Sequence, residues 1–76
     1  MSDIPQISAK EVIKALGKIG FEISRQKGSH IRLVRIQGGV KQLVTVPNHK
    51  VIRKGTLLNG ILKAINLTIE DFKKLL

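Results

Sequence analysis

The sequence predicts a small α+β domain with the element order α-β-β-β-α-α, in which a three-stranded antiparallel sheet carries its helices on one face. Three features predict this fold class: a helical apolar pattern before Gly20, three strand-like segments between residues 21 and 46, and two capped apolar segments after Gly55. The chain has 76 residues, 42% of them hydrophobic. This length and composition are typical of one folded domain, here residues 1–76.

The first helix is expected over residues 9–19. Ser8 and Glu11 have the spacing of a capping box, in which each side chain accepts a hydrogen bond from the other residue's backbone N–H. Gly20 is placed to end the helix in the left-handed conformation. Apolar residues recur between these two signals at helical spacing: Val12, Ile13, Leu16 and Ile19.

Three strands on short turns should form an antiparallel meander. Residues 21–25 alternate with a period of two, which predicts a strand with one buried face, and residues 31–36 form a β-branched second strand. Gly38-Gly39 is a hairpin turn signal, so residues 40–46 make the third strand. Pro47 is expected to stop the ladder because it lacks an amide proton.

A polar, basic loop precedes the last two helices. Thr56 is expected to cap a helix that ends at Asn66. Thr68 should cap a final short helix, with Asp71 near the positive end of its dipole. Three apolar residues are expected to dock this last helix onto the core: Phe72, Leu75 and Leu76.

The composition also bounds the cellular context. Cysteine is absent, which excludes disulfides, thiol catalysis and Cys-rich zinc sites and fits a reducing compartment. The first residues lack the pattern of a signal peptide, and no apolar run approaches the roughly 20 residues of a membrane span. We therefore expect a soluble, cytoplasmic protein without a membrane partner.

Positive charge dominates the middle of the chain. The sequence has 14 Lys and Arg against five Asp and Glu, for a net charge of +9. No carboxylate side chain occurs from Ile23 through Ile69. These positive charges repel one another, and a bound polyanion would relieve the repulsion. We therefore favour nucleic acid or an acidic protein as partner over a merely solvated basic surface.

This charge pattern narrows the possible chemistry. Metal-dependent hydrolases need clustered carboxylates or histidines, which the middle of the chain does not offer, so neither a metal nor another cofactor is expected. RNA, however, brings its own nucleophile, the 2′-hydroxyl. An imidazole with a reference pKa of about 6.5 can accept that proton, and Arg or Lys can stabilise the charged phosphate. On residue pattern alone, a histidine at a strand start such as His30 is more often a surface or packing residue.

Aromatic residues indicate how RNA would be held. Phe21 and Phe72 are the only aromatic rings apart from the histidines, and both occupy apolar positions of the predicted core. The chain therefore lacks a platform on which bases could stack. Recognition should use phosphates and 2′-hydroxyls, with low sequence selectivity.

Two motifs resemble the HicA toxins, also called the YcfA-like family. The first is Arg25-Gln26-Lys27-Gly28-Ser29-His30; the second comprises residues 44–50, followed by residues 54–57 and Ile61-Leu62. The resemblance extends from about Lys10 to Leu76. It implies a double-stranded-RNA-binding-domain-like fold, metal-independent endoribonuclease activity on mRNA, and a type II toxin–antitoxin system with a HicB antitoxin as protein partner.

The resemblance also assigns site residues. The catalytic histidine of the family's Gly-Ser-His motif corresponds to His30. Gly28 would then permit a tight turn or a close approach of backbone to phosphate, and Ser29 could donate a hydrogen bond. His49 has either an RNA-positioning or a structural role. The remaining candidates for RNA contact are basic: Lys27, Arg32, Lys50, Arg53 and Lys54.

The second strand further suggests where a protein partner binds. If Ile31 and Leu33 face the core, then His30 and Arg32 point to the open face together with apolar neighbours. Exposed apolar residues indicate a covering partner, so we expect the antitoxin to occlude His30 there. Two alternatives remain open: a non-catalytic RNA-binding module of similar fold, and a basic DNA-binding regulator, for which the sequence offers no clear recognition helix.

Overall fold

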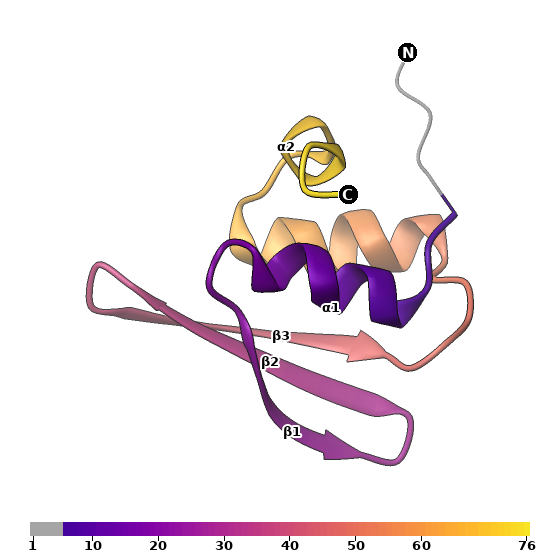
Figure 1. The fold of residues 1–76 in the computed structure, drawn as a ribbon, viewed down its shortest axis with the longest axis horizontal. Coiled ribbons are helices and arrows are strands. Elements are labelled where there is room, and N and C mark those ends of the chain that lie inside the picture. The colour runs from indigo at the N-terminus through magenta and orange to yellow at the C-terminus, as the bar shows by residue number, and fades with distance from the viewer. Residues whose placement is uncertain (1–5) are drawn as a thin grey trace.

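A computed structural model describes residues 6–76 and shows helices over one face of a three-stranded sheet (Figure 1). The strand order is β1-β2-β3, and both neighbouring pairs are antiparallel. The predicted α+β fold class is therefore confirmed. The elements are α1 Ala9–Gly17, β1 Glu22–Lys27, β2 His30–Gln37, β3 Val40–Pro47, the π-helical segment η1 Thr56–Leu62, the 3₁₀ turn η2 Lys63–Ile65, and α2 Ile69–Lys73.

Both predicted ends of α1 are confirmed. The Glu11 backbone N–H donates to Ser8 Oγ at 3.2 Å, and the Ser8 N–H donates to Glu11 Oε1 at 3.1 Å. Gly20 has φ +102°, and the N–H of Phe21 reaches back to the carbonyl of Leu16 at 3.1 Å. This is the Schellman arrangement, so regular α-helix ends at Gly17 and a closing turn continues to the left-handed glycine.

A single hydrophobic core lies between the helices and the sheet. Leu33 of β2 and Val46 of β3 point into it and are fully buried. Each such side chain contributes on the order of 1.5–3 kcal/mol through burial. The largest fully buried side chains come from every layer: Phe72, Leu16, Leu33, Leu57, Ile61, Leu62, Val12 and Val46. Because the helices lie on one face only, the residues that alternate with Leu33 and Val46 remain open to solvent (Figure 1).

The prediction of a buried face on the first strand is wrong. Every residue of β1 is exposed, including Ile23 at 56%, whereas Phe21, just before the strand, is buried. The helical segments α1, η1 and η2 pack on β3, and β2 separates β1 from it. Distance from the helices therefore leaves the β1 edge uncovered.

β3 does not stop before Pro47. The strand includes Pro47, and the N–H of Asn48 continues the ladder by donating to the carbonyl of Ser29 at 2.7 Å. In an antiparallel pair, the N–H groups of alternate residues point away from the partner strand. Pro47, opposite His30, occupies such a position on an edge strand, so its missing N–H removes no bond to β2.

Thr56 does not cap the following helix. The helical hydrogen bonding begins earlier, with the Leu57 N–H donating to the carbonyl of Arg53 at 2.9 Å, and Gly55 already has helical dihedrals (φ −63°, ψ −39°). Thr56 therefore lies inside the helical segment. The predicted end is confirmed, because Asn66 is left-handed with φ 56° and follows η2 directly.

The last helix has the predicted cap. The Asp71 N–H donates to Thr68 Oγ1 at 3.1 Å, and Phe72 is fully buried. Leu75 is partly buried against the core, but Leu76 is 49% exposed, so the docking predicted for it is wrong. Leu76 follows the last helical turn and lies at the surface beside α1, where it lines a small pocket with Lys14 and Lys18 instead of entering the core. Across residues 6–76, each helix falls short of the length and apolarity needed to cross a bilayer.

Candidate nucleic-acid interface

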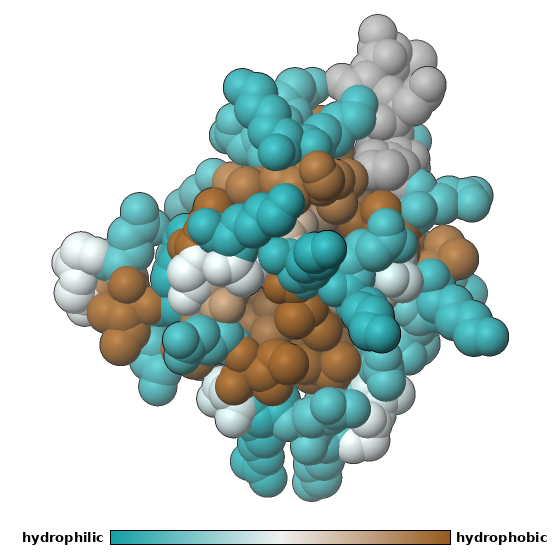
Figure 2. Space-filling model, in the orientation of Figure 1, coloured by the Kyte–Doolittle hydropathy of each residue, from teal (hydrophilic) through white to brown (hydrophobic). Residues whose placement is uncertain are grey.

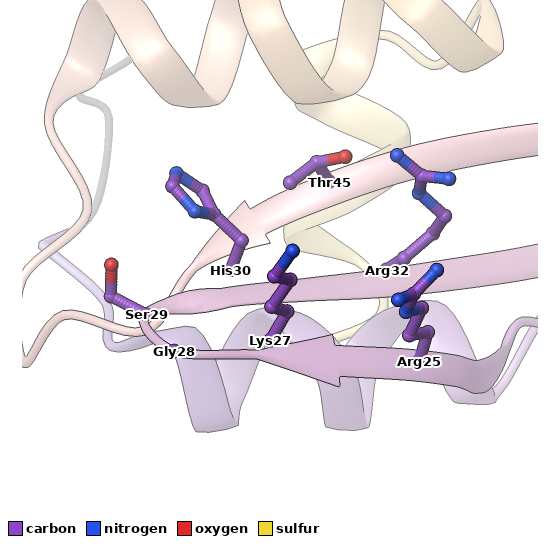
Figure 3. Close-up of a pocket in the computed structure, with 7 residues that line it drawn as sticks. All are labelled: Arg25, Lys27, Gly28, Ser29, His30, Arg32 and Thr45. Atoms are coloured by element: carbon purple, nitrogen blue, oxygen red, sulfur yellow. The ribbon is translucent and has the colours of Figure 1, made fainter.

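A hollow of about 730 Å³ lies on the open face of the sheet, next to the turn between β1 and β2 (Figure 3). Figure 3 shows Arg25 and Arg32 at one end of it, Ser29 and His30 at the other, and Lys27 between them. All of these side chains are exposed. The lining is basic and hydroxylic, contributed by all three strands: Arg25, Lys27, Gly28, Ser29, His30, Arg32 and Thr45.

A two-residue turn sets the position of His30. Gly28 has φ +58°, as the first residue of a tight hairpin turn requires, and a Cβ there would meet nothing within 4 Å. The constraint at Gly28 is therefore conformational rather than steric. The turn makes Lys27 and His30 cross-strand partners. As a result an imidazole and an ammonium group lie on the same face of the hairpin.

The same turn places Arg25 on the open face, because pairing outward from Lys27 and His30 sets Arg25 opposite Arg32. A β-bulge follows: the next pair is Ile23 and Leu33, so Ser24 is an extra residue in β1. The bulge thus sets Ile23 on the core-facing side, although Arg25 lies on the open face. The hollow therefore contains two guanidinium groups, those of Arg25 and Arg32. On the other side of β2, Thr45 of β3 pairs with Arg32.

The loop after β3 holds the other end of the hollow. Its Asn48 N–H bonds the Ser29 carbonyl, directly before His30. The His49 N–H donates to the Pro47 carbonyl at 2.8 Å, and the His49 carbonyl accepts from the Ala9 N–H at 3.0 Å. Ala9 is the first residue of α1, so its N–H has no partner within the helix. The backbone of this loop thus links the turn at Ser29 to the start of α1.

The charges in the hollow are not neutralised by neighbouring side chains. Among residues 6–76, the side chains of Arg25, Lys27 and Arg32 make no hydrogen bond or ion pair. Arg35, by contrast, lies on the helix side, donating to the Ile19 carbonyl at 3.0 Å and to Gln42 Oε1 at 2.9 Å. Within the same part of the chain, no group of three His, Asp or Glu side chains is arranged to hold a metal ion. The hollow is therefore a positively charged surface with an imidazole at its edge, a combination suited in chemistry to an anion.

A family model described as "HicA toxin of bacterial toxin-antitoxin" matches residues 9–67. The chain belongs to the HicA toxin family. The observed order α-β-β-β-α, with its antiparallel sheet, agrees with the double-stranded-RNA-binding-domain-like fold of HicA toxins. Membership makes the protein a toxin of a toxin–antitoxin system, with an antitoxin as partner. No curated protein and no solved structure gave a significant match.

The structure groups some of the predicted HicA site residues and separates others. Five of them line the hollow: Lys27, Gly28, Ser29, His30 and Arg32. The other four do not line it, but lie exposed in or just after the loop that contacts Ser29: His49, Lys50, Arg53 and Lys54. Their separation from the hollow follows from the register, because β3 ends opposite His30 and the chain then turns toward α1.

Sequence reasoning missed Arg25 and Thr45. The two glycine turns contained the signal, because a two-residue turn fixes which residues pair across a hairpin. Pairing outward from Gly28-Ser29 places Arg25 opposite Arg32, and pairing outward from Gly38-Gly39 places Thr45 opposite Arg32. The regular alternation of residues 21–25 hid this relationship, since it takes no account of a bulge.

Apolar residues form a cluster in the other half of the open face, bordered by Lys41 and Glu22. Val34 and Leu43 are cross-strand partners, and Ile36 lies two residues further along β2. Ile36 is 72% exposed and Leu43 is 48% exposed. Figure 2 shows hydrophobic surface over the tip of the β2–β3 hairpin as well. The HicA open face therefore has a basic half around His30 and an apolar half around Leu43.

Proposed function

We propose that this HicA family member is a metal-independent endoribonuclease that cleaves mRNA, with His30 as the catalytic base. One observation carries the proposal: His30 is exposed at the edge of a hollow that contains three cations without side-chain partners among residues 6–76. This combination supplies an imidazole for proton transfer and positive charge for phosphate in one place.

The proposed reaction uses the substrate's own nucleophile. The 2′-hydroxyl proton passes to a ring nitrogen of His30, and the 2′-oxygen forms a bond to phosphorus. The bond from phosphorus to the 5′-oxygen breaks, and that oxygen takes up a proton from solvent water, while His30 returns its proton to solvent; the products are a cyclic 2′,3′-phosphate and a 5′-hydroxyl. Lys27, directly opposite His30, stabilises the extra negative charge on the phosphate oxygens as they gain it.

RNA recognition depends on the strand backbone in this proposal. Phe21 and Phe72 are buried, which leaves no exposed aromatic ring apart from the histidines for base stacking. Gly28 and Ser29 allow the strand to approach the turn closely, and the basic loop residues bind phosphates further along: Lys50, Arg53 and Lys54, with the His49 side chain beside them. Low sequence selectivity follows, because phosphate contacts carry no base information.

A HicB-type antitoxin is the proposed protein partner. We place it across the open face, where the apolar half offers hydrophobic contact and the basic half attracts acidic side chains. Bound there, it would cover His30 and the cations together. Neutralisation would then result from exclusion of RNA.

The decisive experiment replaces each of the two histidines with alanine in turn. Purified protein should cleave RNA in the presence of EDTA, and His30→Ala should abolish cleavage while keeping the circular dichroism spectrum and RNA affinity. His49→Ala is the matched comparison: His49 lies outside the hollow, so cleavage should persist and only RNA affinity should fall. Growth arrest on induction should likewise be lost only in His30→Ala. The alternative, a non-catalytic RNA-binding module, predicts no products and a change of affinity only, and cleavage that survives in His30→Ala would refute the proposed role.

A further inference from the structure

Arg25 and Arg32 form an unusual cross-strand pair. They are directly opposite each other in β1 and β2, both are exposed, and neither side chain has a partner among residues 6–76. Like charges in this position destabilise an antiparallel pair. The turn at Gly28-Ser29 fixes the pair, because regular pairing outward from Lys27 and His30 sets Arg25 opposite Arg32. An anion bound between the two guanidinium groups would relieve the repulsion.

The distance along the strands relates the pair of Arg25 and Arg32 to the proposed catalytic pair of Lys27 and His30. Lys27 and His30 form the next pair on the same face, two residues along each strand. Two residues of a strand span roughly 7 Å. That is comparable with the step from one phosphate to the next along a single RNA strand. Figure 3 shows Arg25 and Arg32 at one end of the hollow, His30 at the other and Lys27 between them.

We infer that Arg25 and Arg32 form a subsite for the phosphate next to the one that is cleaved. The inference rests on the proposed ribonuclease function, in which Lys27 and His30 act at the scissile phosphate. Guanidinium groups suit this task, since each can donate two parallel hydrogen bonds to phosphate oxygens. Thr45, opposite Arg32, adds a hydroxyl donor at the same end of the hollow. The substrate is accordingly an RNA strand with at least two consecutive charged phosphates.

The subsite can be tested by removing one negative charge from the RNA and one positive charge from the protein, separately and together. The substrate is an oligonucleotide with 2′-O-methyl groups at every position except one mapped cleavage site. In two further versions, the linkage directly before or directly after the scissile phosphate is a neutral methylphosphonate. In the wild-type protein, one of these replacements should lower kcat/KM about tenfold or more. In Arg25→Gln and in Arg32→Gln, the same replacement should have an effect below about threefold.

Controls separate this subsite from general charge effects. Lys63→Gln removes one charge from η2, outside the hollow, and should keep the full wild-type sensitivity to the replacement. Arg25→Lys should keep part of it. Equal sensitivity in wild type, Arg25→Gln and Arg32→Gln, or no sensitivity in the wild type, would overturn the subsite. If the wild type cleaves nothing, the proposed function fails, and binding of the fully 2′-O-methylated strand then tests the subsite by the same comparison of affinities.

Discussion

The Asn48 N–H and the Ser29 carbonyl form a 2.7 Å hydrogen bond that joins the end of β3 to the turn before His30. It is the last rung of the β2–β3 ladder, beyond the non-bonded pair of His30 and Pro47. The position of His30 thus depends on the backbone N–H of Asn48, and the preceding residue, Pro47, has no N–H to donate.

Asn48→Pro removes this donor, whereas Asn48→Ala keeps it. We expect Asn48→Pro to lower the free energy of unfolding by about 1 kcal/mol and to reduce RNA cleavage several-fold, because the turn loses its tie to β3. Urea unfolding and single-turnover cleavage measure the two effects. An equal loss of activity in Asn48→Ala would show that the side chain, rather than the backbone donor, matters.

Gly28→Ala and Gly55→Ala should change stability in opposite directions. Both sites have open space for a Cβ, but Gly28 has φ +58° and Gly55 has φ −63°. We expect Gly28→Ala to destabilise the fold by about 1–2 kcal/mol because of its left-handed backbone. Gly55→Ala should stabilise it by about 0.5–1 kcal/mol through reduced entropy of the unfolded chain. Chemical denaturation of both variants checks the signs, and a neutral result for Gly28→Ala would contradict the conformational argument.

Arg25→Gln and Arg35→Gln are the same chemical change, but we expect the first to raise the stability of the fold and the second to lower it. Arg25 faces a like charge, so its removal should raise stability by up to about 1 kcal/mol, more at low salt. Arg35 bonds Ile19 and Gln42 and lies 4.7 Å from the ring centroid of Phe21, so its removal should lower stability by about 1–3 kcal/mol. Thermal unfolding at two salt concentrations measures both. Destabilisation by Arg25→Gln would mean that the two guanidinium groups do not repel each other.

Leu43→Glu should separate neutralisation from cleavage. Leu43 lies in the apolar half of the open face, away from the hollow, so we expect near-normal cleavage but antitoxin affinity weakened about tenfold or more. Titration calorimetry with the cognate antitoxin and an RNA cleavage assay give the two readings. Val51→Glu is the control, since Val51 is similarly exposed at 53% but lies in the loop after β3. Unchanged antitoxin affinity in Leu43→Glu would place the interface elsewhere.

Local interactions explain why much of the fold follows from the sequence alone. The capping box at Ser8, the left-handed Gly20 and the cap at Thr68 involve residues within one or two turns of one another, so their spacing already specifies them. The glycine turn before Val40 likewise fixed the register of β2 against β3. The motif that contains His30 needed only its residue types and order.

Tertiary packing decided which parts of the sheet stay exposed. The two glycine turns set Arg25 and Thr45 opposite Arg32, and regular alternation with Leu33 sets Arg35 on the helix side, against Phe21. The bulge at Ser24 sets Ile23 opposite Leu33 on the core-facing side, but the helices pack on β3 and leave every residue of β1 exposed. Neither the bulge nor the extent of helix coverage is encoded in residue spacing, because both arise where segments distant in the chain meet.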